Sequence, residues 1–356
     1  MGDRAFPLVT SIILMHRADE TCGSKASSIA VWETEGCAIG NRIDFLDLSC
    51  YFQSTIRRVL EGFMKQKWMF ISALVFAVGL AADSVQARTK GGEVVLLVRA
   101  DDIGSSHAAN AACIDSYRNG IARSVDIMVP CPWFPEAVRM LAENQGLDVG
   151  VHLTLTSEWE NMKWGPLTCA PSLVDPDGYF FPMVWENKEF PPKCSLKEAA
   201  WDILQVEREL RAQIELALKY IPRISHVSGH MAFERMHPAL DSLVRKLEKE
   251  YGLEAAFPEG MKGFRGFGQG KTAKEKIRNF VNALEALEPG IYMLVDHPGE
   301  DGPEMRAIGH KGYYGVAAER GDVTRLFTDK KVLKTVREKG IKLVSYRDLK
   351  ELPAHE

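Results

Sequence analysis

Acidic and imidazole side chains follow apolar runs at four places in the sequence. These places hold Asp101 with Asp102, His152, His226 with His230, and His297. One carboxylate with two imidazoles is a common ligand set for a divalent catalytic metal, and it leaves open positions for water and substrate. A second carboxylate could accept a proton from the activated water, because the metal lowers the pKa of that water. The residue types therefore indicate a metal site that activates water.

The adjacent carboxylates of Asp101 and Asp102 are a separate indication of a bound cation. Neighbouring negative charges at a strand end repel one another and neither is fully solvated, so a bound cation would lower that energetic cost. Taken singly, an Asp-Asp pair is also a common surface dipeptide, and a lone histidine is more often a hydrogen-bonded structural residue than a ligand. The prediction therefore depends on all four places lying at predicted strand ends.

Strands alternate with helices from residue 93 onward. The strands are predicted at 93–100, 124–129, 148–155, 224–228, 253–256, 290–295 and 342–345. The helices are predicted at 105–119, 134–144, 195–220, 238–251, 272–287 and 330–339. Around seven short strands separated by helices predict an α/β fold, namely a deformed or incomplete (β/α) barrel that forms a single catalytic domain.

The strand at 93–100 shows why such a sheet is expected. Its apolar run VVLLV is typical of a parallel strand that is buried on both faces. Ser105 and Ser106 can cap the following helix, and Gly120 is placed to end it in a left-handed conformation. In α/β barrels the carboxyl ends of the strands build the active site, so the four places should converge there.

Five motifs occur in an order and at spacings that one known family shares. They are Arg99-Ala100-Asp101-Asp102-Ile103-Gly104 with Asn110, Gly120-Ile121, Gly150-Val151-His152-Leu153-Thr154-Leu155, the segment from His226 to His230, and His297-Pro298-Gly299. Together they resemble the YdjC-like carbohydrate deacetylases, a family that includes chito-oligosaccharide deacetylases. The similarity spans about residues 93–350.

The resemblance implies a reaction and the residues that perform it. It implies metal ligation by Asp102, His152 and His230, with Asp101 as the general base and His297 as an acid or a substrate-orienting group. The implied reaction is metal-dependent hydrolysis of N-acetyl groups on amino sugars or short oligosaccharides, with release of acetate. The implied fold is a deformed, seven-stranded (β/α) barrel. An Asp-His-His set suits several divalent ions, of which we expect zinc or magnesium.

The third ligand is the point at which the residues alone leave two options. His226 and His230 are four residues apart, so both would face the same side of an extended strand. The resemblance favours His230, which also lies just past the strand end and reaches the barrel mouth more easily. The family usually has an aspartate at Ser228, a further histidine at Ala232 and a phenylalanine at Ile103. The serine removes a carboxylate that would orient a ligand, an effect of roughly 10- to 100-fold on metal affinity.

Aromatic residues in the long connection 156–194 are candidates for a wall that binds sugar rings. Trp159 and Trp164 are the main candidates, because the C–H faces of sugars suit aromatic surfaces. A local hydrophobic patch that anchors the connection is the alternative. His226 and Arg306 are further substrate-binding candidates, although the position of Arg306 also fits an ordinary surface loop.

The segment 64–87 has the pattern of a secretory signal peptide. Lys65 and Lys67 precede an apolar run at 68–82, and a small-residue exit ends at Ala87. The run is shorter than the roughly 20 residues that a membrane span needs. We therefore expect export to the periplasm or the medium after cleavage near Ala87.

The signal peptide divides the chain into unequal parts. Residues 88–356 are expected to form the YdjC-like barrel. Residues 1–63 show only weak hydrophobic periodicity and are expected to be translated upstream sequence, with a small extra domain as the alternative. Of the seven cysteines, four lie in the predicted barrel, and their disulfide connectivity cannot be read from the sequence.

Charge and composition restrict the partners. The formal net charge of −4 offers phosphates no broad basic surface, so nucleic acid is not an expected partner. The expected partner is a small acetylated sugar or oligosaccharide, with membrane contact only through the signal segment and a homodimer as a compatible oligomeric state. Two alternatives to the deacetylase stay open. One is a metal-dependent amidohydrolase acting on a non-sugar amide or ester, and the other is a non-catalytic carbohydrate-binding protein, which Ser228 would favour.

Overall fold

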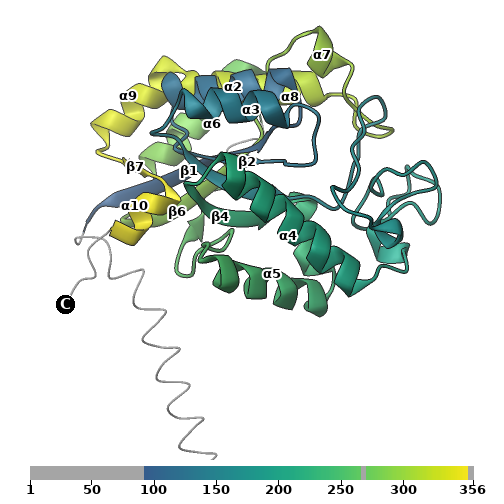
Figure 1. Ribbon diagram of the computed structural model, residues 1–356. Coiled ribbons are helices and arrows are strands. Elements are labelled where there is room, and N and C mark those ends of the chain that lie inside the picture. Colours follow the sequence, from purple (N-terminus) through teal and green to yellow (C-terminus); the bar gives the residue numbers. More distant parts are fainter. Residues whose placement is uncertain (1–91, 266–269, 352–356) are drawn as a thin grey trace, which may run out of the picture. The chain divides into compact units, whose positions relative to one another are not determined.

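A parallel β-sheet with helices on two sides forms the part of the protein that the structure describes. This computed structural model describes residues 92–265 and 270–351 (Figure 1). The predicted leader at 1–63 and the predicted signal peptide at 64–87 lie outside these residues. Within the described ranges, no helix is both long and apolar enough to cross a membrane.

Seven parallel strands make up the described sheet. They are β1 (Val94–Ile103), β2 (Ser124–Ile127), β3 (Asp148–Leu153), β4 (Ile224–Gly229), β5 (Lys262–Gly263), β6 (Gly290–Asp296) and β7 (Lys342–Val344). Six of them follow the order β4-β3-β2-β1-β6-β5, and β7 pairs with β1 off this path. The α/β fold with a parallel sheet is confirmed. The path of paired strands contains six members rather than the predicted seven.

Helices flank the sheet on two sides. They are α2 (His107–Arg118), α3 (Phe134–Ala142), α4 (Ile203–Tyr220), α5 (Pro238–Tyr251), α6 (Ala273–Glu285), α7 (Pro303–Arg306), α8 (Val316–Thr328), α9 (Lys330–Glu338) and α10 (Tyr346–Glu351). Short 3-10 turns occur at η1 (Pro171–Leu173), η2 (Leu196–Glu198) and η3 (His230–Met236). In Figure 1, α2, α3 and α8 lie on one side of the strands, and α4 and α5 lie on the other.

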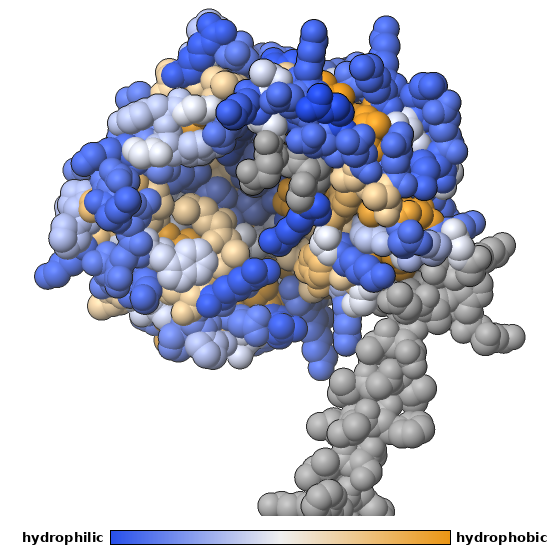
Figure 2. Space-filling model, turned by 180° about the vertical axis from the view of Figure 1, so that it is seen from behind, coloured by the Kyte–Doolittle hydropathy of each residue, from blue (hydrophilic) through white to orange (hydrophobic). Residues whose placement is uncertain are grey.

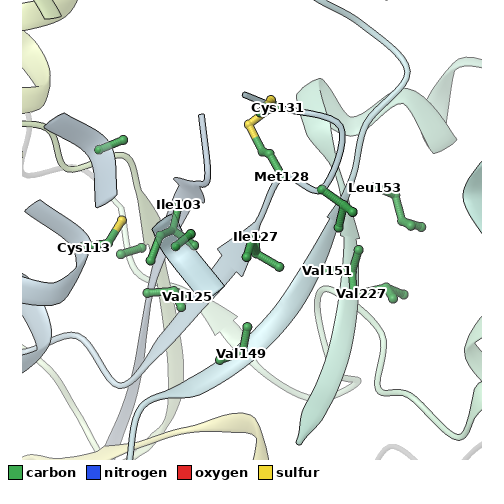
Figure 3. Packing of buried hydrophobic residues seen from close by; sticks show 14 of the residues in the cluster. Ile103, Cys113, Val125, Ile127, Met128, Cys131, Val149, Val151, Leu153 and Val227 are labelled. Atoms are coloured by element: carbon green, nitrogen blue, oxygen red, sulfur yellow. The ribbon is translucent and has the colours of Figure 1, made fainter. Parts of the chain in front are cut away.

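The two faces of the strands differ in polarity because successive residues point to opposite faces. Figure 3 shows one face, where Val125, Ile127, Val149, Val151, Leu153 and Val227 from β2, β3 and β4 pack together in the main core. The intervening positions, which face the other side, hold Asp126, Gly150, His152, His226 and Ser228. The inner side of the curled sheet is therefore polar along these three strands.

The inner face of β1 changes from apolar to charged along its length. Val95 and Leu97 join a small apolar cluster with Tyr346, whereas Arg99 and Asp101 are charged and buried. The interior is thus filled by hydrocarbon near the amino end of β1. Near the carboxyl ends it is lined by charge, which is where the predicted site residues lie.

The prediction of a strand at 253–256 is wrong. Glu254 forms an isolated parallel bridge with His226, and the fifth strand of the sheet is β5, further along the chain. The carbonyl of Ala256 instead accepts a hydrogen bond from the guanidinium of Arg99 at 3.2 Å. The backbone of this segment is therefore bound both by β4, through Glu254, and by a side chain from the interior, at Ala256.

The predictions for the longer helices need two corrections, and the short helices α7 and α10 were not predicted either. The helix expected at 195–220 begins at Ile203, because the side chain of Asp202 accepts from the backbone N–H of Leu204 at 2.9 Å and caps the helix there. Helix α8 was not predicted at all. It has Gly321 near its middle and no side-chain hydrogen bond at its amino end, so the usual start signal is missing.

Gly120 follows α2 as predicted, but for a different physical reason. It is not among the described glycines with positive φ. A Cβ atom at this position would lie 2.5 Å from the carbonyl oxygen of Ser116 and 2.6 Å from that of Phe327. Glycine is therefore needed because the end of α8 approaches α2 closely here.

Candidate active site

A bulge in β1 turns two consecutive carboxylates toward the same space. Between Ala100 and Ile103 the pairing shifts register, since three residue steps on β1 match two on β2. Asp102 has a φ of 72°, in the left-handed region that residues other than glycine seldom adopt. Extra residues of this kind redirect side chains and are frequent beside active sites. Asp101 and Asp102 consequently both face the polar interior.

Asp102, His152 and His230 converge at the carboxyl ends of β1, β3 and β4. His152 Nε2 lies 3.5 Å from Asp102 Oδ1, and His230 Nδ1 lies 3.6 Å from the same oxygen. The two imidazole rings meet edge to face, with 5.1 Å between their centroids. All three side chains are buried, and their ligand atoms lie within 4.8 Å of one another. This grouping could hold a metal ion.

The hydrogen bonds around this group leave room for a cation. Among the described residues, Asp102 Oδ1 and His230 Nδ1 are buried atoms without a hydrogen-bond partner. A buried polar atom in that state costs about 1–3 kcal/mol. A divalent ion between Asp102 Oδ1, His152 Nε2 and His230 Nδ1 would give both atoms a partner. Two nitrogens and one oxygen suit zinc better than magnesium, which prefers oxygen ligands.

Each of the two histidines is held at its remote ring nitrogen. His230 Nε2 lies 3.1 Å from the carboxylate of Glu158, and His152 Nδ1 lies 2.6 Å from Ser228 Oγ. Partners at the remote nitrogen fix the orientation and the tautomer of a ligating imidazole. Glu158 was not predicted, because nothing in its local sequence distinguishes it from a surface glutamate.

The two imidazoles have opposite pKa shifts. Burial lowers the pKa of His152 and so favours the neutral form that binds metals. Burial also lowers the pKa of His230, but the carboxylates of Glu158 and Asp102 together raise it more, so that its pKa lies above the usual value. A metal would therefore compete with a proton at His230, and metal affinity should weaken as the pH falls.

Arg320 from α8 binds the second oxygen of Asp102. Its Nη2 donates to Asp102 Oδ2 at 2.6 Å, and both side chains are buried. Burial alone would raise the pKa of Asp102, but Arg320 and the neighbouring histidines lower it more, to far below the usual range. Asp102 is therefore ionised, with Oδ1 left for a cation. Arg320 was missed because α8 was missed.

Asp101 is held by a two-point ion pair. Arg99 Nε and Nη2 donate to its two carboxylate oxygens at 2.7 Å and 3.0 Å, and Arg99 Nε also lies 3.3 Å from Asp126. Asp101, Asp126 and His152 form a second group whose ligand atoms lie within 4.8 Å of one another. Because Arg99 binds both oxygens of Asp101 and also contacts Asp126, the group around Asp102 is the better candidate for a metal.

His226 lies away from the candidate metal group. Its Nε2 is 2.6 Å from Asp126 Oδ1, its Nδ1 is 2.7 Å from Ser225 Oγ, and its ring stacks on Tyr346 with 3.5 Å between centroids. These contacts leave neither ring nitrogen for a metal. Of the two histidines that the sequence left open, the structure places His230 beside Asp102.

The backbone after β4 accounts for the position of His230. Met231 and Ala232, which follow it in η3, both have a left-handed φ of 53°. Such strained residues persist only where the surrounding structure holds them, and they are frequent at functional sites. The turn that they make holds His230 at the strand end.

His297 follows β6 and lines the same cavity as Asp102. Its side chain is 43% exposed. Partial burial lowers the pKa of His297, but the carboxylates of Asp102 and Asp296 raise it more, so that its pKa lies above the usual histidine value. A raised pKa favours the protonated imidazole, which can act as a general acid.

A cavity of about 680 Å³ opens over the candidate metal group. Residues around it include Asp102, Glu158, Trp159, His230, His297 and Arg320. This volume lies within the usual range for small-molecule sites. Figure 2 shows one face of the molecule, which is mostly hydrophilic and is hollowed near its centre.

Trp159 and Trp164, both predicted to bind substrate, occupy different environments. Trp159 is buried and lines the cavity, with Arg320 over its ring at 5.5 Å from the centroid. Trp164 is also buried, and its Nε1 donates to the carbonyl oxygen of Thr156 at 2.7 Å. Its ring meets that of His230 edge to face. The contacts of Trp164 are those of an anchor for the connection.

Arg306, the remaining substrate candidate, lies at the surface. Its Nε donates to Asp301 at 2.7 Å, and it is not among the residues that line the cavity. Two aromatic residues near it in sequence do line the cavity, namely His310 and Tyr313. The ring of His310 stacks on Trp159 with 5.7 Å between centroids. No spacing in the sequence distinguished these two residues from their loop.

Fold and site together define a class of protein: an α/β chain whose parallel strands deliver an Asp-His-His group to a cavity. Comparison with known proteins gives the family. The model of the YdjC-like protein family matches residues 95–338. The chain therefore belongs to the YdjC-like family, which confirms the resemblance seen in its motifs.

Individual relatives agree with this assignment. A carbohydrate deacetylase of Thermus thermophilus is 31% identical over 61% of this chain and 82% of its own length. One from Thermoanaerobacter pseudethanolicus is 28% identical over 72% of this chain and 99% of its own. An Enterococcus faecalis structure, provisionally described as a cellobiose-phosphate cleavage protein, is 21% identical and covers 72% of this chain and 99% of its own, with a TM-score of 0.56. That structure supports the fold alone.

Proposed function

We propose that this chain is a metal-dependent hydrolase that removes acetyl groups from amino sugars or short oligosaccharides. The observation that carries the proposal is the buried group of Asp102, His152 and His230, in which two facing ligand atoms have no hydrogen-bond partner among the described residues. Membership of the YdjC-like family supports the reaction class, and the relatives described as carbohydrate deacetylases support the substrate class.

The residues of this site can divide the reaction among them. A divalent ion, with zinc preferred over magnesium, would polarise the acetamide carbonyl and lower the pKa of a nearby water. Asp101 accepts the proton of the attacking water. Arg99 fixes its orientation, and each carboxylate oxygen retains a further lone pair. His297 donates a proton to the leaving amine, and the products are acetate and a free amino sugar.

Trp159 is the substrate contact that the cavity supports best, because its ring lines the space beside Asp102 and His297. Trp164, His226 and Arg306 stay predictions from the sequence. None of these three is among the residues that line the cavity.

Acetate release from N-acetylglucosamine oligomers tests the proposal. The full-length chain is stripped of metal with a chelator and resupplied with zinc or magnesium, beside the variants Asp102→Ala and Asp177→Ala. Asp177 is an exposed aspartate outside the cavity and serves as the matched control. We expect release that requires metal, vanishes in Asp102→Ala and persists in Asp177→Ala. No release from the intact protein with either metal would contradict the proposal.

The same experiment, extended to other substrates and to a binding measurement, distinguishes the two alternative functions. A metal-dependent amidohydrolase would release acetate from acetylated non-sugar amides or esters and not from the oligomers. A carbohydrate-binding protein would bind the oligomers without releasing acetate. Ser228 motivated this second alternative, and its hydrogen bonds to Asp126 and His152 now weigh against it.

Export and oligomeric state are further proposals that come from the sequence. Cleavage near Ala87 would place the enzyme in the periplasm or the medium, and a homodimer is the oligomeric state to be tested. The amino-terminal sequence of the mature protein and its mass in solution would test them.

A further inference from the structure

Ser228 lies between a candidate metal ligand and a carboxylate of the neighbouring strand. Its hydroxyl donates to Asp126 Oδ2 and lies 2.6 Å from His152 Nδ1. All three side chains are buried, with exposed fractions of 0% for Asp126 and 3% for Ser228 and His152. The loss of the family's usual aspartate at position 228 therefore does not leave His152 without an outer partner.

The direction of these hydrogen bonds fixes the tautomer of His152. A carboxylate paired with a guanidinium, as Asp126 is with Arg99 at 3.3 Å, only accepts hydrogen bonds. Ser228 has one hydroxyl proton, which goes to Asp126. Its oxygen must therefore accept from His152 Nδ1–H. A neutral imidazole protonated at Nδ1 has its lone pair on Nε2, which is the nitrogen that faces Asp102.

We propose that Asp126 is a positioning residue that acts through Ser228 to hold His152 with Nδ1 protonated and Nε2 free for the metal. A carboxylate on β2 and a hydroxyl on β4 together replace the single aspartate that the family usually has on β4. The inference deepens the proposed metal-dependent function and rests on it.

The surroundings of Asp126 suit this role. Its other oxygen, Oδ1, lies 2.6 Å from His226 Nε2, so the carboxylate is held at both ends. Arg99, which contacts Asp126, also holds Asp101 through two hydrogen bonds. The proposed base and the proposed positioning residue therefore share one guanidinium, and His226 acts as a support for Asp126 rather than as a ligand.

We call Asp126, Ser228 and His152 the relay. The zinc affinity of the full-length chain tests this relay without an activity assay. Competition with a chromophoric chelator would give the affinity of wild type, Ser228→Ala, Asp126→Asn and the double variant. An amide has one acceptor oxygen where a carboxylate has two, so Asp126→Asn cannot serve both His226 and Ser228. We expect each single variant to bind zinc about 10- to 100-fold more weakly, and the double variant no more weakly than the weaker single.

Ser124→Ala is the matched control for these variants. Ser124 is a buried serine on β2 whose hydroxyl donates to Asp148 at 3.2 Å and contacts no member of the relay. We expect it to bind zinc with the wild-type affinity. Equal affinity in wild type and in folded Ser228→Ala would overturn the relay. No zinc binding by wild type would instead remove the proposed function on which the relay rests.

A spectroscopic measurement on the wild-type protein is independent of whether the variants fold. Nitrogen-15 spectra of histidine-labelled, metal-free protein distinguish the two neutral tautomers, and the signal that is lost in His152→Asn belongs to His152. We expect the Nδ1–H tautomer in wild type and a loss of that preference in Ser228→Ala. An Nε2–H tautomer in wild type would contradict the proposal.

Discussion

Asp102 has two oxygens with different partners, and this division defines the candidate metal site at the scale of single residues. Oδ2 binds Arg320 and Oδ1 remains for a cation. The two ring nitrogens of His230 also have different surroundings: Nε2 contacts the carboxylate of Glu158, and Nδ1 faces Asp102. The hydrogen bonds thus leave one atom of each of these two candidate ligands available for a metal.

Asp101→Asn separates proton transfer from metal binding. The amide cannot accept the water proton, and general-base catalysis typically contributes about 100- to 10,000-fold to the rate. We expect kcat for acetate release to fall by about that factor while zinc affinity stays close to that of wild type. Zinc titration and circular dichroism of the same preparation are the controls. A variant that keeps its kcat would show that Asp101 is not the base.

The three candidate ligands could be singled out from the sequence, whereas their supporting partners could not. Asp102, His152 and His230 lie at the ends of strands that apolar runs in the sequence predict. The supports reach them from far along the chain: Glu158 is 72 residues from His230, and Arg320 is 218 residues from Asp102. A pair that forms only through the tertiary fold leaves no local pattern in the sequence.

At the scale of secondary-structure elements, the bulge in β1 and the helix α8 position the charged side chains of the candidate site. The bulge adds one residue to the strand and brings Asp101 and Asp102 to one side. Helix α8 delivers Arg320, and its last turn contacts Gly120 at the end of α2. Neither the bulge nor helix α8 was predicted from the sequence. A bulge depends on the register between two strands, and α8 lacks a capping side chain.

Gly120→Ala tests the contact between α2 and α8. A Cβ there would lie within 2.6 Å of two backbone oxygens, so the helices must move apart, at a cost of about 1–3 kcal/mol in the free energy of unfolding. Because α8 carries Arg320, we also expect weaker zinc binding. Urea unfolding and zinc titration would measure the two effects.

Gly252→Ala is the control for that variant. Gly252 has a φ of 66° and nothing within 4 Å of a Cβ, so alanine there costs backbone strain without a clash. We expect a loss of stability with unchanged zinc affinity. If Gly120→Ala were as stable as wild type, the close approach of the helices would be wrong.

At the scale of the whole molecule, one parallel sheet has an apolar core on its outer face and an interior that divides into two zones. Val95 and Leu97 fill the zone near the amino end of β1, and buried charges fill the zone near its carboxyl end. The alternation of strands and helices predicted this fold from the sequence. The strand predicted at 342–345 corresponds to β7, whereas the two-residue β5 could not be predicted, because so short a strand has no periodicity to detect.

The buried carboxyls predict acid lability of the metal-free protein. Burial raises the pKa of Asp102 and of Asp126, but their cationic neighbours lower both further, to below the usual range. The unfolded chain, with an aspartate pKa of about 3.9, therefore binds more protons than the folded chain at low pH. The free energy of unfolding should fall as the pH drops below about 4, and these two carboxyls should add no pH dependence above about pH 5.

Urea unfolding of the metal-free full-length chain between about pH 3 and pH 6 measures this effect. Asp102→Asn should reduce the slope with pH, and the exposed-site control Asp177→Asn should not. A free energy of unfolding that rises on acidification through this range would rule out the depressed pKa values.

The central claim is the position of the metal, and anomalous diffraction at the zinc edge tests it most directly. Crystals of the full-length protein grown with zinc should show a peak about 2.0–2.2 Å from each of Asp102 Oδ1, His152 Nε2 and His230 Nδ1. A peak between Asp101 and Asp126 instead, or peaks at the surface with none beside Asp102, would contradict the account.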